Sequence, residues 1–159
     1  MELSIVVREA TADDAIPISG LLTALAEEFI VGEFSEEGRR HLLAHFSVTE
    51  MAERLVSTKY RFQVAEIDGA LVGVVAVRER SHLQYLFVSR ACQRMGVARC
   101  LWEQARQQAG TASGRFTVNA SSYAMPAYRR LGFKVVGAVQ ETNGVRFQPM
   151  EWVWESSIS

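Results

Sequence analysis

Residues 60–88 alternate apolar and polar side chains with a period near two, which is typical of half-buried β-strands. The stretch consists of YRFQVAEI, the dipeptide Asp68-Gly69, ALVGVVAVRER and then HLQYLFV. An Asp-Gly pair between two such runs is a strong signal for a β-hairpin. We therefore predict three consecutive antiparallel strands in this part of the chain.

The other predicted elements surround this block. Before it, the sequence predicts a strand at residues 3–8, a helix from Thr11 to about Ile30 and a shorter helical region within residues 39–57. After it come a helix from about Gln93 to near Gly110, a strand at 116–120, a short helix at 124–131 and a terminal hairpin at 133–154. The strand at 116–120 must return parallel, because a helix precedes it. This order predicts one α+β domain, residues 1–159, around a mixed, mostly antiparallel sheet of about seven strands with about four helices.

Length and charge limit the function. The 159 residues, 48% of them hydrophobic, suit a single domain with one core. The 17 basic and 18 acidic residues nearly balance, so we expect neither nucleic acid nor a membrane as partner. The start MELSIVVREA lacks the basic and apolar regions of a signal peptide, no unbroken apolar run has membrane-spanning length, and two cysteines fit reduced thiols. We expect a cytoplasmic protein.

Residues 93–98, QRMGVA, place a lone glycine at the start of a predicted helix that follows a predicted strand. The first N–H groups of a helix lack partners within it, and the helix dipole adds partial positive charge there. Gly96 would let an anion approach these amides, and Arg90, Arg94 and Arg99 add charge. The GK[ST] and G-x-G-x-x-G motifs of nucleotide sites are missing. An equally good interpretation is that Gly96 merely allows a tight turn and that the arginines form a solvated surface.

A second segment, VNASSYAMPAYRRLGF at residues 118–133, contains two candidate polar residues. Met125, Tyr128 and Leu131 share one helix face, so Tyr128 on its own is best interpreted as a core tyrosine. Asn119 on its own could simply end a strand.

Taken in order, residues 81–133 resemble the GNAT superfamily of acetyl-CoA-dependent N-acetyltransferases. Gln93, Gly96 and Ala98 fill the fixed positions of the family signature Arg/Gln-x-x-Gly-x-Gly/Ala. Tyr128 matches the tyrosine of the family's Tyr-x-x-x-Gly-Phe segment, and the terminal NGVRFQPMEWVW is similar to one branch of the superfamily. Arg94 departs from the glycine that many members carry.

The resemblance implies a coenzyme A site between the fourth and fifth strands, which would splay apart. The pyrophosphate would lie on the amides of residues 94–99, and the pantetheine arm would pair like an extra strand with the end of the fourth strand. The implied coenzyme-binding residues are Phe87, Val88, Gln93, Arg94, Met95, Gly96, Val97, Ala98, Arg99 and Asn119. The Val88 N–H could polarise the acetyl carbonyl, and Tyr128 would protonate the leaving thiolate, whose ordinary pKa is about 8.5.

The reaction also needs a group that takes a proton from the acceptor. A lysine-like amine of pKa about 10.4 lies about 3.4 pKa units above pH 7, so freeing it costs about 4.6 kcal/mol. The candidates near the cleft are His82, Glu66 and Glu79, and His82 has the best-suited pKa. His82 could instead be an exposed residue at a strand end.

We assign no catalytic or metal-binding role to two further groups of side chains. His41 and His45 are one helical turn apart but lack a HExxH glutamate or a clear third ligand, so we interpret them as a solvated helix face and expect no metal. Cys92 and Cys100 have no histidine neighbour in sequence, which favours buried small side chains over an acyl-enzyme.

We therefore predict direct transfer of acetyl from acetyl-CoA to an amine in a ternary complex, with Tyr128 and His82 as the catalytic residues. The acceptor would lie near Phe29, Phe34 and the Thr142-Asn143 turn. A mildly acidic rim that would suit a cationic amine is formed by Glu27, Glu28, Glu33, Glu36 and Glu37, although surface solvation explains these residues equally well. The rival hypothesis is a non-catalytic acyl-CoA-binding regulatory module. A homodimer through Trp152 and Trp154 is possible, but both are equally good core residues.

Overall fold

The computed structural model of the protein describes residues 4–109 and 114–153. Its strands are β1 (Ile5–Glu9), β2 (Tyr60–Ile67), β3 (Ala70–Arg78), β4 (His82–Val88), β5 (Arg115–Ala120), β6 (Lys134–Val135), β7 (Gln140–Thr142) and β8 (Val145–Val153). Its α-helices are α1 (Ala15–Leu25), α2 (Glu36–His45), α3 (Val48–Val56), α4 (Val97–Ala109) and α5 (Met125–Arg130). Leu3, Gly110 and Trp154, which belong to predicted elements, lie outside the described residues.

The strands form one mixed sheet with the order β1-β2-β3-β4-β5-β8-β6, and β7 pairs with the free length of β8. The β4–β5 pair is parallel, and the other pairs in the described chain are antiparallel. The predicted α+β fold with a mostly antiparallel sheet is therefore confirmed. The described residues contain eight strands and five α-helices, where about seven and about four were expected.

The extra strand arises because the stretch predicted as one strand at 133–141 divides into β6 and β7, which both pair with β8. The division lies opposite Pro149. The Val136 N–H donates to the Pro149 carbonyl at 3.1 Å, so the nitrogen of Pro149, which has no hydrogen, faces the same edge. The ladder therefore loses one donor, and the Gln148 side chain donates instead to the Gly137 carbonyl at 2.5 Å.

The predicted first helix also differs from the regular form. A 3-10 turn at Ala12–Asp14 precedes α1, and a π-helical turn at Ala26–Ile30 follows it. The helical region after it divides into α2 and α3 at Ser47, whose side chain accepts from the Glu50 N–H at 3.3 Å and caps α3.

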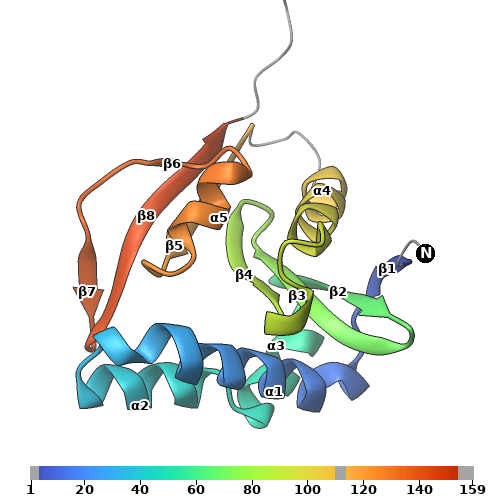
Figure 1. Cartoon of the computed structure of the whole chain (residues 1–159), viewed down its shortest axis with the longest axis horizontal. Coiled ribbons are helices and arrows are strands. Elements are labelled where there is room, and N and C mark those ends of the chain that lie inside the picture. Colours follow the sequence, from blue (N-terminus) through green and yellow to red (C-terminus); the bar gives the residue numbers. More distant parts are fainter. Residues whose placement is uncertain (1–3, 110–113, 154–159) are drawn as a thin grey trace, which may run out of the picture.

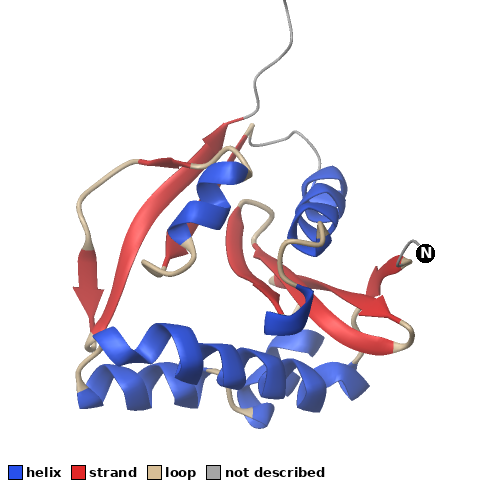
Figure 2. Cartoon of the chain, in the orientation of Figure 1, coloured by secondary structure: helices blue, strands red, loops and turns tan. Residues whose placement is uncertain are grey.

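Helices cover both faces of the sheet (Figure 1, Figure 2). The first three helices pack on one face, where the fully buried Ile18, Leu22 and Met51 contact the sheet. The segment Ala12–Glu33 is long and apolar enough, by length and composition alone, to cross a membrane. Its buried side chains account for that composition, as in the core helix of a globular domain.

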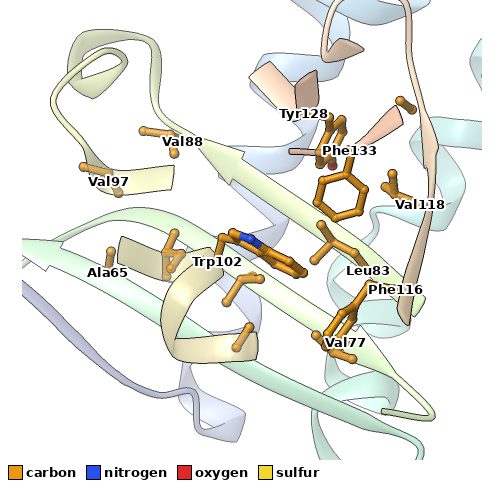
Figure 3. Close-up of a cluster of buried hydrophobic side chains, with 14 of the residues drawn as sticks. Ala65, Val77, Leu83, Val88, Val97, Trp102, Phe116, Val118, Tyr128 and Phe133 are labelled. Atoms are coloured by element: carbon orange, nitrogen blue, oxygen red, sulfur yellow. The ribbon is translucent and has the colours of Figure 1, made fainter. Parts of the chain in front are cut away.

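The second core lies between the sheet and helices α4 and α5 (Figure 3). Trp102 of α4 lies edge-on to Phe116 of β5, with ring centroids 4.9 Å apart, and also contacts Phe133 and Trp152. Trp152, a candidate for dimerisation, thus packs against the core of its own chain.

The functional geometry comes from two irregularities of β4. Gln84 is an extra residue in the β3–β4 ladder, because Ala76 pairs with Tyr85 and Val77 pairs with Leu83. This bulge turns Leu83 and Tyr85 toward opposite cores. On its other edge β4 pairs with β5 only at His82–Thr117 and Leu83–Val118, and beyond these pairs the strands diverge (Figure 1).

The hairpin of β7 and β8 docks on the beginning of α2 through two glycines. A Cβ placed on Gly38 would overlap the carbonyl oxygen of Gly144, a backbone atom that cannot easily move aside. The Ser35 side chain caps α2 by accepting from the Gly38 N–H at 3.1 Å. The close approach of the two backbones thus depends on glycine at position 38.

We predict that Gly38→Ala lowers the free energy of unfolding by about 1–3 kcal/mol, because the added methyl group must push the hairpin away. Gly20→Ala is the matched control: Gly20 is exposed in α1, and a Cβ there would meet no atom within 4 Å. That change should stabilise the protein by about 0.5–1 kcal/mol through helix propensity. Urea denaturation of both variants measures the difference, and equal effects would contradict the docking role of Gly38.

Candidate active site

The diverging ends of β4 and β5 form the walls of a cavity of about 910 Å³. It extends from the turn before α4, past the end of β4, to the first two helices and β8. A cavity of about 450 Å³ adjoins it at Arg146 and Phe147, which line both. Of the residues expected to bind coenzyme, those that line the large cavity are Phe87, Val88, Gln93, Arg94, Gly96, Val97, Ala98, Arg99 and Asn119. Met95 is exposed and is not among the lining residues.

The turn before α4 presents backbone amides to the cavity. The Cys100 N–H donates to the Gly96 carbonyl at 3.1 Å, so Gly96 is the last residue before the helix. The N–H groups of Val97, Ala98 and Arg99 therefore have no acceptor within the helix. Gly96 has a φ of 85°, and a Cβ there would meet no atom within 4 Å. An anion can approach these amides closely.

The end of β4 turns its polar backbone groups toward the splay. The Gln93 Nε2 donates to the Val88 carbonyl at 3.1 Å, and the Tyr123 hydroxyl donates to Gln93 Oε1 at 3.0 Å. Within a strand, the N–H and C=O of one residue face the same edge, so the Val88 N–H also faces the cavity. Phe29 of the π-helical turn stacks on Tyr123, with ring centroids 4.4 Å apart.

Tyr128 lies on α5 and lines the cavity from the β5 side. It is only 6% exposed, and its ring meets Phe133 edge-on at 5.5 Å (Figure 3). Burial raises the pKa of the Tyr128 hydroxyl well above its usual value of 10.0, so the group stays protonated at neutral pH. Tyr128 therefore packs as a core tyrosine and also contributes to the wall of the cavity.

His82 lies away from these groups. It begins β4 at the closed end of the splay, where its Nδ1 is 2.8 Å from Thr117 Oγ1, and it is not among the residues that line the cavity. Burial, with a smaller contribution from Arg78, lowers the pKa of His82 to about 4. Glu66 bonds to Arg8 at 2.7 Å, and neither Glu66 nor Glu79 lines the cavity. The structure therefore does not bring the predicted bases to the site.

His45 does not lie on a solvated helix face, and the structure corrects that interpretation. It is half-buried, lines the cavity and lies 2.7 Å from the Tyr85 hydroxyl through Nε2. Arg54 Nη2 lies 2.9 Å from His45 Nδ1. Because a guanidinium only donates hydrogen bonds, Nδ1 is the acceptor, and the neutral ring donates from Nε2 to Tyr85. The helical spacing signals a shared face with His41 but not that Tyr85, 40 residues away, covers it.

Burial and nearby cations keep His45 neutral. Desolvation is the main cause, followed by Arg54, His41 and Arg78, and together they lower the pKa of His45 to about 4. Burial raises the pKa of Tyr85 well above its usual value. The pair is therefore an uncharged hydrogen-bonding wall of the cavity near neutral pH.

The expected acidic rim does not face the cavity either. Glu28 is paired with Arg90 in an ion pair, and Glu33 accepts a hydrogen bond of 2.5 Å from Ser122. None of the five glutamates of residues 27–37 lines the large cavity, although Glu33 lines the adjoining one. By contrast, Phe34 lines the large cavity as expected.

Comparison with known proteins decides what kind of site this is. A family model described as "Acetyltransferase (GNAT) domain" matches residues 30–154. The chain belongs to the GNAT acetyltransferase family. A search of curated protein sequences gave no significant match.

Solved structures show the same GNAT fold. A GCN5-related N-acetyltransferase from Rhodopseudomonas palustris superposes with a TM-score of 0.82 at 21% identity, covering 96% of this chain and 98% of the other. The PaiA N-acetyltransferase from Thermoplasma acidophilum, solved with coenzyme A, gives a TM-score of 0.77 at 18% identity, covering 94% and 99%. The N-acetylglutamate synthase from Neisseria gonorrhoeae, solved with coenzyme A and N-acetyl-glutamate, gives 0.65 at 22% identity, covering 98% of this chain and 36% of that one.

Membership of the GNAT family makes the protein an acetyltransferase with acetyl-CoA as cosubstrate, and the geometry fits that molecule. The free amides and Arg99 at the α4 turn suit a pyrophosphate, and the edge of β4 suits an amide-containing arm. Arg94 has a φ of 66°, a left-handed conformation that accounts for the glycine of many GNAT members at this position. Among the residues that the structure describes, no group of three or more His, Cys, Asp or Glu side chains could hold a metal ion.

The lowered pKa of His82 has a consequence for stability. Folding favours its neutral ring, so its contribution is fully present above the ordinary pKa of about 6.5 and is lost as the pH falls toward 4. We predict that His82→Gln reduces the loss of thermal stability between pH 6.5 and pH 4 by more than the exposed His41→Gln variant does, because His41 acts only as a minor cause of the lowered pKa of His45.

Because His82 lies outside the cavity, the same His82→Gln variant should also keep kcat within about twofold of the wild type at pH 7.5. Melting curves across the pH range and a thiol-release assay measure the two properties. A drop in kcat of about a hundredfold would instead identify His82 as the general base.

Proposed function

We propose that the protein transfers acetyl directly from acetyl-CoA to an amine within a ternary complex. The observation that carries this proposal is the single cavity that joins the amide-rich α4 turn, the end of β4 and Tyr128 to a separate apolar end. One cavity with two distinct ends can hold two substrates with their reacting atoms in contact. The three similar solved structures include two named N-acetyltransferases, which supports nitrogen as the acceptor atom.

Acetyl-CoA supplies an acetyl group activated as a thioester. In the proposed arrangement the amides of Val97, Ala98 and Arg99 hold the pyrophosphate, and Asn119 on β5 binds the pantetheine arm from the opposite wall. The Gln93 side chain must release the Val88 carbonyl for that arm to pair with β4. The Val88 N–H then donates to the acetyl oxygen as negative charge develops on it.

Electrons and protons balance without a covalent enzyme intermediate. The nitrogen lone pair forms the new N–C bond while the C–S bond breaks, and the electron pair leaves with sulfur. Tyr128 donates its hydroxyl proton to that sulfur, and a proton from the amine returns through water to restore the phenol. The raised pKa keeps Tyr128 protonated before each turnover.

We predict that Tyr128→Phe lowers kcat by about a hundredfold or more while the KM for acetyl-CoA stays within about twofold, because only proton donation is lost. The hydroxyl removed is the sole chemical change, and the ring keeps its contact with Phe133. Tyr60→Phe, on β2 outside the cavity, is the matched control. Steady-state thiol release measures both parameters, and unchanged turnover of Tyr128→Phe would remove the assignment.

A further inference from the structure

The end of the cavity away from the α4 turn is mainly apolar. Its walls come from the α1–α2 segment, α2 and β8, and include Leu25, Ile30, Phe34, Leu42, Phe46 and Phe147. Phe46 is 3% exposed and lies edge-on to Phe87 of β4 at 5.9 Å, so this wall is packed and not a loose surface. An acceptor that fills this end with an apolar group removes apolar surface from water, which favours binding.

The charges that line the cavity are all of one sign. Among its lining residues, all of which are described, there is no aspartate or glutamate, and there are four arginines: Arg94, Arg99, Arg130 and Arg146. The first three lie at the α4 and α5 end, where Arg99 Nη2 donates to the Arg130 carbonyl at 3.3 Å. Arg146 of β8 is an exposed residue that lines both the large and the adjoining cavity.

The polar groups that α2 and β4 contribute near the apolar end are neutral. His45 accepts from Arg54 at Nδ1, so it cannot also take a proton there without losing that bond. Tyr85 keeps its proton, and the bulge residue Gln84 has a buried Oε1 without a hydrogen-bond partner. A cationic group on the acceptor would therefore meet no carboxylate among the residues that line the cavity, whereas a neutral N–H can donate a hydrogen bond to Gln84 Oε1.

Two acidic groups approach Arg146 from outside the large cavity. Glu33 lines the adjoining cavity with Arg146, but its carboxylate accepts from Ser122. Glu141 of β7 lies directly opposite Arg146 in the β7–β8 ladder. None of the ion pairs found in the described residues includes Arg146. Its guanidinium can therefore bind an anion of the acceptor, in the bidentate geometry that arginine forms with carboxylates.

We propose that the acceptor is a small primary amine that carries both a carboxylate and an apolar group, as in an α-amino acid with an aromatic or branched aliphatic side chain. Arg146 binds the carboxylate, the Phe34–Phe46–Phe147 wall holds the apolar group, and the amine enters uncharged. The inference rests on the proposed function and adds the class of acceptor. Polycationic amines are disfavoured, because no carboxylate lines the cavity to bind a further positive charge.

Matched amines test this proposal directly. L-Phenylalanine and phenethylamine share the aromatic body and the amine and differ in the carboxylate, and spermidine represents the polycations. We expect the wild-type kcat/KM for L-phenylalanine to exceed that for phenethylamine by at least about tenfold, because the carboxylate gains a charged hydrogen bond. Spermidine should be the poorest of the three.

Two arginine variants separate recognition from general damage. Arg146→Gln should reduce kcat/KM for L-phenylalanine by at least about tenfold through a higher KM and leave phenethylamine within about twofold. Arg40→Gln, an exposed arginine of α2 outside the cavity, is the control and should leave both amines unchanged. Arg146→Lys should retain part of the preference, because it keeps the charge but not the bidentate geometry.

The outcomes distinguish the two proposals. Equal or better turnover of phenethylamine, a preference for spermidine, or an Arg146→Gln variant that loses both aromatic amines equally would overturn the acceptor class while leaving N-acetyl transfer intact. Thiol release with none of the amines, despite binding of acetyl-CoA, would overturn the proposed function itself.

Discussion

Two residue pairs join β4 to β5, and the site depends on the pairing ending there. His82 pairs with Thr117 and Leu83 with Val118, and the Trp102–Phe116 contact lies in the core beneath this end of the sheet. Beyond these pairs each strand has one edge without a neighbour. Such backbone groups are costly to bury unpaired, so the protein fills the gap with its own groups, as Gln93 does at Val88. The unpaired edges of β4 and β5 therefore line the cavity, and the sheet has fewer hydrogen bonds there as a result.

The fold and the turn before α4 could be predicted because their signals are local. The alternating runs around Asp68-Gly69 predict a hairpin whatever surrounds them, and β2 and β3 form it. The lone Gly96 indicates a helix start with free amides, and its φ of 85° is a conformation that favours glycine. The splay itself is implied only by resemblance, since no pattern in β4 or β5 shows where their pairing stops.

The apolar end of the cavity could not be predicted because it is assembled from distant residues. The sequence favours a solvated helix face for His45 because no third metal ligand accompanies His41 and His45, yet Tyr85 of β4 and Arg54 of α3 contact His45. The sequence favours a catalytic role for His82 because it lies on the right strand, but the β4–β5 register places it at the closed end with Thr117. In both cases tertiary contacts determine the surroundings of a histidine, and sequence spacing contains no information on those contacts.

The charge of the cavity lining could not be predicted from the sequence either. Five glutamates within residues 27–37 indicate an acidic surface, and composition alone would favour a cationic acceptor. The helix changes to a π-helical turn at Ala26–Ile30, and the glutamates there and beyond do not line the cavity, with Glu28 held by Arg90 and Glu33 by Ser122. The side chains of this segment that do line the cavity are apolar, Ile30 and Phe34 among them. The electrostatics of the site are thus set by which side of one irregular helix faces inward, and an acidic sequence contributes an apolar wall.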